Sequence, residues 1–287
     1  MSHSGPVDAA TPHIAVAPFF LDTAGGRIFA VHHAPPDAHG HVLCVPGFNE
    51  EMNRCRSMLT LQARALAAAG LGTLLIDLHG TGDSEGDFVD GRWDRWQDNI
   101  GAAAAWLDAR GGCVALLGVR LGVMLASEWM HAHPDGGRAL VAWQPVADGK
   151  QYLTQFLRMR IAANMDRTDI PKETTSSMRE QMAQGVPVEV GGYEIHPQLA
   201  QAIDARQLAT LAPPGGTRVA WLEQRTPASD VPTPAGERVI AAWRAAQVAV
   251  DVIPFEGQAF WQLHERSLAL DALDATTGWV RKAGGRP

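Results

Sequence analysis

Apolar residues along this chain gather in short runs that alternate with longer segments of helical periodicity. Strand-like runs occupy 14–21, 27–33, 41–45, 74–76, 114–117, 139–143, 219–222 and 248–253. Helical patterns rich in Leu and Ala separate most of these runs, at 57–69, 93–110, 123–131, 235–246 and 267–281. Because strands that alternate with helices form crossover units, the pattern predicts an α/β fold. Its eight-stranded sheet should be mostly parallel and flanked by helices on both faces.

One long interval interrupts the alternation. Residues 149–214 are polar, mostly helical in pattern and rich in Arg, Gln, Met and Thr. They lie between two predicted parallel strands, where an insertion covers the carboxyl ends of the sheet. We therefore predict a core of 14–148 and 215–283, a helical cap at 149–214 and a flexible tail at 1–13.

The segment Gly118-Val119-Arg120-Leu121-Gly122 lies between a predicted strand and a predicted helix. Glycines at both ends of such a turn allow the strand and the helix to approach closely. In the Gly-x-Ser-x-Gly form of this turn, the central serine attacks a carbonyl carbon. Here the central residue is Arg120, whose guanidinium stays protonated and has no lone pair to attack with. The turn thus predicts the backbone geometry that presents a nucleophile, with a central residue that cannot act as one.

Four motifs give the chain a specific likeness when they are taken together with the order of strands and helices. They are Val45–Asn53, Asp77–Ser84, Gly118–Gly122 and Trp143–Val146. The chain resembles the α/β-hydrolase superfamily, and over 20–279 it looks like the bacterial family called exosortase A system-associated hydrolase 2. The resemblance implies the α/β-hydrolase fold, hydrolysis of ester or thioester bonds, and a setting in exopolysaccharide production and protein sorting. It also implies a protein partner from such an exosortase system.

The resemblance assigns the three members of a catalytic triad to positions in this chain. The elbow residue is Arg120, and the acid after the seventh strand is Asp230. The catalytic histidine of the superfamily lies in the loop after the last strand, which here is 255–261 and holds no histidine; His264 follows a few residues later. Loss of triad members leaves about 10³–10⁴-fold catalysis over water, which is too little for ordinary serine-hydrolase turnover.

The resemblance also assigns an oxyanion hole, whose two donors are the backbone N–H groups of Phe48 and Leu121. Side chains expected at the same edge of the sheet, as candidate ligand-binding residues, are Glu50, Glu51, Asn53, Gln144, Gln258 and Trp261. The polar loop 49–56 has two interpretations. Its charged side chains line the mouth of the pocket, or they form a solvated helix start in which the glutamates favour the helix dipole.

Arg120 itself has two interpretations. Its guanidinium forms an ion pair with a nearby carboxylate, for which Asp230 is a candidate, or it clamps a carboxylate or phosphate group of a ligand. Cys55, between Arg54 and Arg56, also has two interpretations. The arginines lower the pKa of a thiol that then attacks esters or thioesters, or Cys55 is a small residue that packs at a helix start.

Composition narrows the classes of function. The net charge is −7, which gives no electrostatic footprint for nucleic acid. Three cysteines without a C-x-x-C pair indicate a reduced, cytoplasmic protein, and we expect neither a signal peptide nor a membrane span. The 11 histidines show no H-x-x-x-H pair and no glycine-rich phosphate loop opens a helix, so we expect no metal and no cofactor.

Two classes of function remain open. The first is a protein on a hydrolase scaffold that binds a small acyl or anionic ligand, or a protein partner, without turnover. The second is an ester or thioester hydrolase with an unorthodox nucleophile such as Cys55. A polysaccharide-binding module has little support, because the tryptophans are scattered along the chain.

Overall fold

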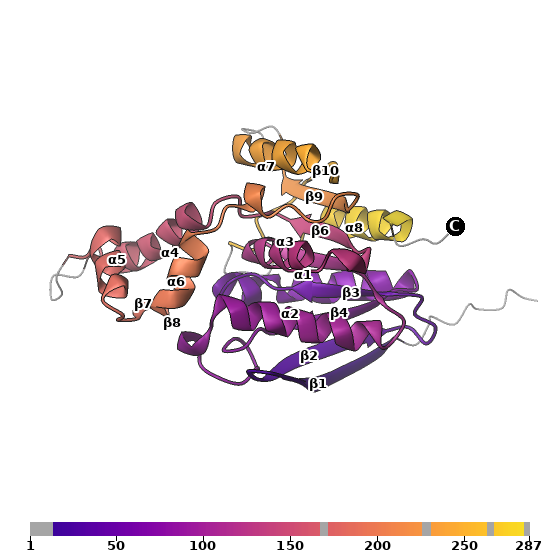
Figure 1. Ribbon diagram of the computed structural model, residues 1–287, viewed down its shortest axis with the longest axis horizontal. Helices are drawn as coiled ribbons and strands as arrows, with labels where there is room; N and C mark the ends of the chain where they lie inside the picture. Colours follow the sequence, from indigo (N-terminus) through magenta and orange to yellow (C-terminus); the bar gives the residue numbers. More distant parts are fainter. Residues whose placement is uncertain (1–13, 167–171, 226–230, 263–266, 284–287) are drawn as a thin grey trace, which may run out of the picture.

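A computed structural model describes residues 14–166, 172–225, 231–262 and 267–283 (Figure 1). The main sheet has eight strands in the order β1-β2-β4-β3-β5-β6-β9-β10. These strands are β1 (Ala15–Thr23), β2 (Gly26–Ala34), β3 (His41–Val45), β4 (Gly72–Ile76), β5 (Cys113–Val119), β6 (Ala139–Trp143), β9 (Arg218–Gln224) and β10 (Ala249–Phe255). The helices around them are α1 (Glu50–Ala68), α2 (Trp93–Asp108), α3 (Leu121–Ala132), α7 (Pro234–Ala245) and α8 (Leu270–Ala283).

The direction of the strands matches the predicted α/β-hydrolase fold. β1 and β2 are antiparallel to each other, and β2 is antiparallel to β4. Each further neighbouring pair, from β4 and β3 to β9 and β10, is parallel. Parallel strands end at a common edge of the sheet, so the turns after β3, β5, β6 and β9 are brought together there.

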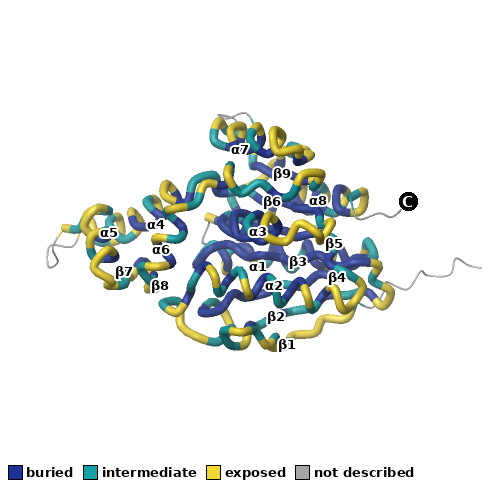
Figure 2. Tube along the Cα trace, in the orientation of Figure 1, coloured by how far each residue is buried: buried dark blue, intermediate teal, exposed yellow. Residues whose placement is uncertain are grey.

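Successive residues of the central strands face opposite sides of the sheet, and each side has its own core. Leu43 of β3 and Leu116 of β5 face the side that α2 and α3 cover. Val42 and Leu117 face the other side, which α1 and α8 cover. Because both faces are covered, the central strands are buried throughout, as Figure 2 shows in dark blue.

α1 begins earlier than the apolar pattern indicates. The predicted helix starts at 57, whereas α1 starts at Glu50, where the Asn49 side chain accepts a hydrogen bond from the Glu50 N–H at 2.7 Å. The polar segment therefore forms the first two turns of a helix, with Glu50 and Glu51 at its positive end. The segment thus begins a helix, but this helix start is not solvated throughout, because the Glu51 side chain is only 15% exposed and faces Arg120.

The chain between β6 and β9 contains the segment that we call the cap (149–214), whose labelled α-helices and hairpin lie to one side of the sheet in Figure 1. It holds α4 (Gly149–Ala163), α5 (Thr175–Ala183) and α6 (Pro197–Asp204), together with the hairpin β7 (Val188–Val190) and β8 (Tyr193–Ile195). The sequence pattern did not predict the hairpin. No helix within the described ranges has the length and apolar character needed to cross a membrane.

Candidate functional site

The elbow between β5 and α3 has the predicted strand–turn–helix geometry. Arg120 is its single connecting residue, with φ 55° and ψ −118°, and its N–H donates to the Trp143 carbonyl oxygen at 2.9 Å. A Cβ on Gly122 would lie 2.3 Å from the Pro46 carbonyl oxygen, and one on Gly118 would lie 2.6 Å from the Cα of Val123. Both glycines are therefore required by backbone contacts, and Arg120 between them has a strained conformation.

The Arg120 side chain is held by the first turn of α1. Its Nε donates to Oε1 of Glu51 at 3.0 Å, and its Nη1 donates to the Gln144 carbonyl oxygen at 3.1 Å. The side chains of Arg120 and Glu51 are 14% and 15% exposed, so the pair is largely shielded from water. Arg120 thus forms an ion pair, as one of its two interpretations expects, and its partner is Glu51. Asp230, the candidate partner, lies outside the described residues.

Aromatic rings complete the surroundings of this guanidinium. Tyr152 of α4 donates its hydroxyl to Oε2 of Glu51 at 2.7 Å, and its ring centroid lies 5.7 Å from the Arg120 guanidinium carbon. The Trp261 ring, from the loop after β10, lies 5.5 Å from the same carbon. Burial, and then the Glu51 carboxylate, raise the pKa of Tyr152 well above its usual value, so its hydroxyl stays protonated. Sequence reasoning named Trp261 but missed Tyr152, because one tyrosine in a helical stripe carries no local signal.

The predicted oxyanion donors lie at the starts of two helices. Phe48 precedes α1, and Leu121 is the first residue of α3, directly after the elbow. Within the described part of the chain, neither backbone N–H donates a hydrogen bond to another protein group. An oxyanion hole requires such donors without a partner inside the protein.

Glu50 and Asn53 take part in a second contact with the cap. Tyr193 of β8 donates its hydroxyl to Glu50, and the Asn53 side-chain amide donates to the Tyr193 oxygen at 3.2 Å. Burial and the Glu50 carboxylate raise the pKa of Tyr193 to about 12. In this structure these two predicted ligand-binding residues join the core to the cap.

Of the two interpretations of Cys55, the activated thiol is contradicted by its surroundings. Its side chain is fully buried, and burial, followed by the negative charge of Glu51, raises the pKa of the thiol. The positive charges of Arg120 and Arg54 act in the opposite direction but are outweighed, because removing a thiolate from water costs more than these charges return. The structure therefore supports the alternative in which Cys55 is a small packing residue of α1.

Gln144 and Gln258, two further predicted ligand-binding residues, are held by hydrogen bonds within the protein. Gln144 has a φ of 45°, and its Oε1 accepts from the Gln224 N–H at 2.8 Å, which ties the end of β6 to the end of β9. Oε1 of Gln258 accepts from the Ser267 hydroxyl at 2.6 Å. His264 lies outside the described residues.

A cavity of about 180 Å³ lies beside Arg120, between the ends of β6 and β9 and the cap. Its polar lining residues are Arg120, Gln144, Asp148, Gln151, Tyr152, Gln155, Glu223 and Thr233. Gln151 and Gln155 face it from the first two turns of α4, and sequence reasoning missed both. Ligands of open α/β sheets bind at the carboxyl ends of strands, which is where this cavity lies.

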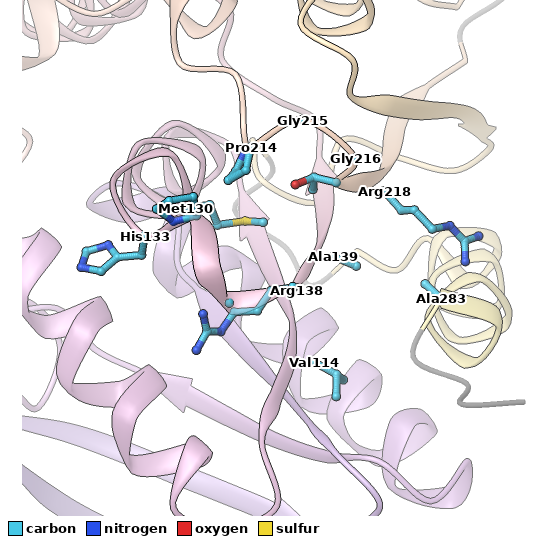
Figure 3. Close-up of a pocket in the computed structure, with 14 residues that line it drawn as sticks. Val114, Met130, His133, Arg138, Ala139, Pro214, Gly215, Gly216, Arg218 and Ala283 are labelled. Carbon is cyan, nitrogen blue, oxygen red and sulfur yellow. The ribbon is translucent and has the colours of Figure 1, made fainter.

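A larger cavity, of about 310 Å³, lies at the opposite end of the sheet, where β5, β6 and β9 begin (Figure 3). Its two arginines, Arg138 and Arg218, point in different directions. Arg138 pairs with Asp108 at 2.6 Å, and Arg218 donates to the Lys282 carbonyl oxygen at 3.1 Å. Because Arg138 and Arg218 already bind other protein groups and no elbow lies beside this cavity, it is not the candidate site.

No three His, Cys, Asp or Glu side chains in the described part of the chain are grouped as a metal site would need.

Comparison with known proteins supports the same architecture. The profile of the Hydrolase_4 family, described as serine aminopeptidase, S33, matches residues 36–233. No curated protein is significantly similar to the chain.

Solved structures resemble it at low sequence identity. DcsB in complex with its substrate analogue has a TM-score of 0.62 and 16% identity, with 94% of this chain and 100% of that chain covered. Est1E from Butyrivibrio proteoclasticus with bound ferulic acid has a TM-score of 0.62 and 16% identity, over 92% and 96%. The thioesterase domain from the curacin biosynthetic pathway has a TM-score of 0.55 and 17% identity, over 93% and 99%. At these identities the likeness establishes the α/β-hydrolase fold alone.

Proposed function

Since the chain belongs to the Hydrolase_4 family, described as serine aminopeptidase, S33, we propose that it binds an acyl or anionic ligand at its elbow without serine-hydrolase turnover. The observation that carries this proposal is the engagement of Arg120. The residue at the nucleophile position is a protonated guanidinium, fixed by Glu51 and by the Gln144 carbonyl. A group without a lone pair cannot form the acyl-enzyme bond that serine forms.

The rest of the site suits binding. A carbonyl oxygen of a ligand can accept from the N–H groups of Phe48 and Leu121, neither of which donates to another group in the described ranges. The cavity beside Arg120 offers about 180 Å³ for the remainder of the ligand. The Nη2 of Arg120 also has no protein acceptor in the described part of the chain, so it is available to a carbonyl or carboxylate oxygen.

The fold neighbours suggest which acyl groups to consider. One of them binds ferulic acid, and another is a thioesterase domain. We propose an ester, a thioester or the corresponding acid as the ligand class. The alternative of hydrolysis by Cys55 loses its support, because the thiol is fully buried and its pKa is raised.

The four motifs named above are the basis for a narrower proposal. We propose that the chain is a member of the exosortase A system-associated hydrolase 2 group and acts with a protein of an exosortase or exopolysaccharide system. A cytoplasmic location is proposed with it, because all three cysteines are free, which suits a reducing compartment.

Covalent labelling tests the absence of serine-type catalysis. Fluorophosphonate probes should not label the wild-type protein, and Arg120→Ser should show no more than background esterase activity, because the loop 256–261 holds no histidine to accept the serine proton. Parallel labelling of an active serine esterase is the control. Stoichiometric labelling of a wild-type serine would contradict the proposal.

A further inference from the structure

Charge around the candidate site is unevenly distributed. Among the described residues that line the cavity beside Arg120, that arginine is the single cation, whereas Asp148 and Glu223 are both carboxylates. Glu51, which contacts Arg120, adds a third carboxylate. The arginine charge is therefore matched within the protein before any ligand arrives.

Each carboxylate is fixed by hydrogen bonds. Asp148 accepts from the Gln151 N–H at 2.8 Å as the N-cap of α4. Glu223, only 4% exposed, accepts from Nε1 of Trp221 at 2.9 Å and from the Thr233 N–H at 3.2 Å. None of these contacts is a second cation, so the described lining residues leave no excess positive charge for an anion.

Glu51 is fixed most directly against the arginine. One of its oxygens accepts from Arg120, and the other accepts from the Tyr152 hydroxyl. Both carboxylate oxygens are thus held in place, and Glu51 cannot swing away without losing an ion pair and a hydrogen bond in a poorly solvated site. Charges in such a site interact more strongly than they do in water.

We infer that Glu51 determines the ligand class, so that the site admits an uncharged acyl group (an ester, thioester or amide) and rejects the free carboxylate. The inference rests on the proposed function and narrows it. A ligand carboxylate bound beside Arg120 would add a negative charge next to Glu51, and no second cation among the described lining residues would balance it. A carbonyl oxygen carries only a partial charge, which the N–H groups of Phe48 and Leu121 are suited to stabilise.

The walls of the cavity fit the same class. Gln151 and Gln155 contribute uncharged amides from α4, and Thr233 contributes a hydroxyl near the start of α7. These groups donate to and accept from uncharged polar atoms, without a preference for an anion.

Two probes of equal chain length test the inference. Hexanamide and hexanoate carry a neutral and a negative head group on the same alkyl chain. Their dissociation constants should be measured by isothermal titration calorimetry with the wild-type protein, Glu51→Gln and Glu50→Gln. Glu50→Gln is the matched control, since Glu50 carries the same charge one residue away but bonds to Tyr193 rather than to Arg120.

The wild-type protein should bind hexanamide at least tenfold more tightly than hexanoate. Glu51→Gln should bind hexanoate at least tenfold more tightly than the wild type does, and Glu50→Gln should keep the wild-type preference. Equal or tighter binding of hexanoate by the wild type would overturn the inference alone. Binding of no probe by any variant would overturn the proposed function with it.

Folding of the variant needs its own check. If circular dichroism shows that Glu51→Gln is unfolded, Tyr152→Phe replaces it, because this variant leaves the Glu51 charge in place and removes one hydrogen bond. Tyr152→Phe should still prefer hexanamide over hexanoate. Loss of that preference would show that the hydroxyl, and not the charge of Glu51, sets the ligand class, which contradicts the inference.

Discussion

Arg120 and Asn49 share one backbone conformation, although they lie in separate turns at the same edge of the sheet. Arg120 has φ 55° and ψ −118°, and Asn49 has φ 42° and ψ −122°. Each residue immediately precedes a helix that follows a parallel strand. Such a conformation costs a residue other than glycine about 1–3 kcal/mol, so the fold tolerates strain at both turns that flank the predicted oxyanion hole.

The first prediction concerns the ion pair at the elbow. Arg120→Met should lower the free energy of unfolding by about 3 kcal/mol, because it leaves the Glu51 carboxylate poorly solvated and without its cation. Urea denaturation followed by fluorescence measures the change. The double variant Arg120→Met/Glu51→Met should regain at least half of the loss, and equal stability of the single and double variants would show that the pair is not coupled.

The second prediction compares two glycines. Gly122→Ala should destabilise the protein by about 3 kcal/mol, because its Cβ would meet the carbonyl oxygens of Pro46 and Val45. Gly278→Ala in α8 is the control, since a Cβ there meets nothing within 4 Å. This second change should stabilise the helix by about 0.5–1 kcal/mol. A Gly122→Ala melting temperature equal to that of the wild type would contradict the close approach of α3 to the turn after β3.

The sequence predicts the central strands well and the helix ends less well. The expected bounds of β3 and β6, 41–45 and 139–143, are those observed, because each strand is an uninterrupted apolar run. The start of α1 was missed because its first two turns are polar and resemble a loop. The hairpin of β7 and β8 was missed because each strand has three residues, too few to show alternation.

Sequence reasoning about the site reached the elbow but not its partners. The flanking glycines mark Arg120 as the elbow residue from local pattern alone. Its bond to Glu51 spans 69 positions and the bond from Tyr152 to Glu51 spans 101, and no local pattern predicts pairings at such separations. The sequence left both interpretations of Cys55 open for a related reason, because sequence neighbours show which charges are near a thiol but not how deeply it is buried.

The third prediction concerns thiol chemistry. Native protein should react with Ellman's reagent slowly and substoichiometrically, because Cys44, Cys55 and Cys113 are all buried and burial raises the pKa of each. All three thiols should react at once in urea. Peptide mapping after brief alkylation identifies the modified residue. One fast-reacting thiol located at Cys55 would restore it as a candidate nucleophile.

The fourth prediction concerns acid stability. Burial, then the nearby charges of His41, Arg110 and His33, lower the pKa of His32 to about 4. The unfolded chain therefore takes up a proton as the pH falls below about 6.5, whereas the folded protein does so only near pH 4. Stability should fall through this window and then level off, by up to about 3 kcal/mol for His32. Burial also lowers the pKa values of His33 and His41, so these two histidines also reduce the stability of the folded protein as the pH falls.

Urea denaturation at pH 7.5, 5.5 and 4.5 measures this slope. His32→Phe keeps an aromatic ring against Trp106 but removes the titrating group, so its stability should depend less on pH. An identical slope in the variant and the wild type would assign the acid sensitivity to other groups.

The two bonds from the cap to Glu50 and Glu51 have an optical consequence. The chain contains only two tyrosines, and each is the donor of one of these bonds. While the cap is seated, tyrosinate absorbance should rise only at strongly alkaline pH, because the pKa of Tyr193 is about 12 and that of Tyr152 is raised well above its usual value. Release of the cap would return both hydroxyls to ordinary ionisation near pH 10. An ultraviolet titration of the unlabelled protein therefore reports whether the cap is bound to the first turn of α1.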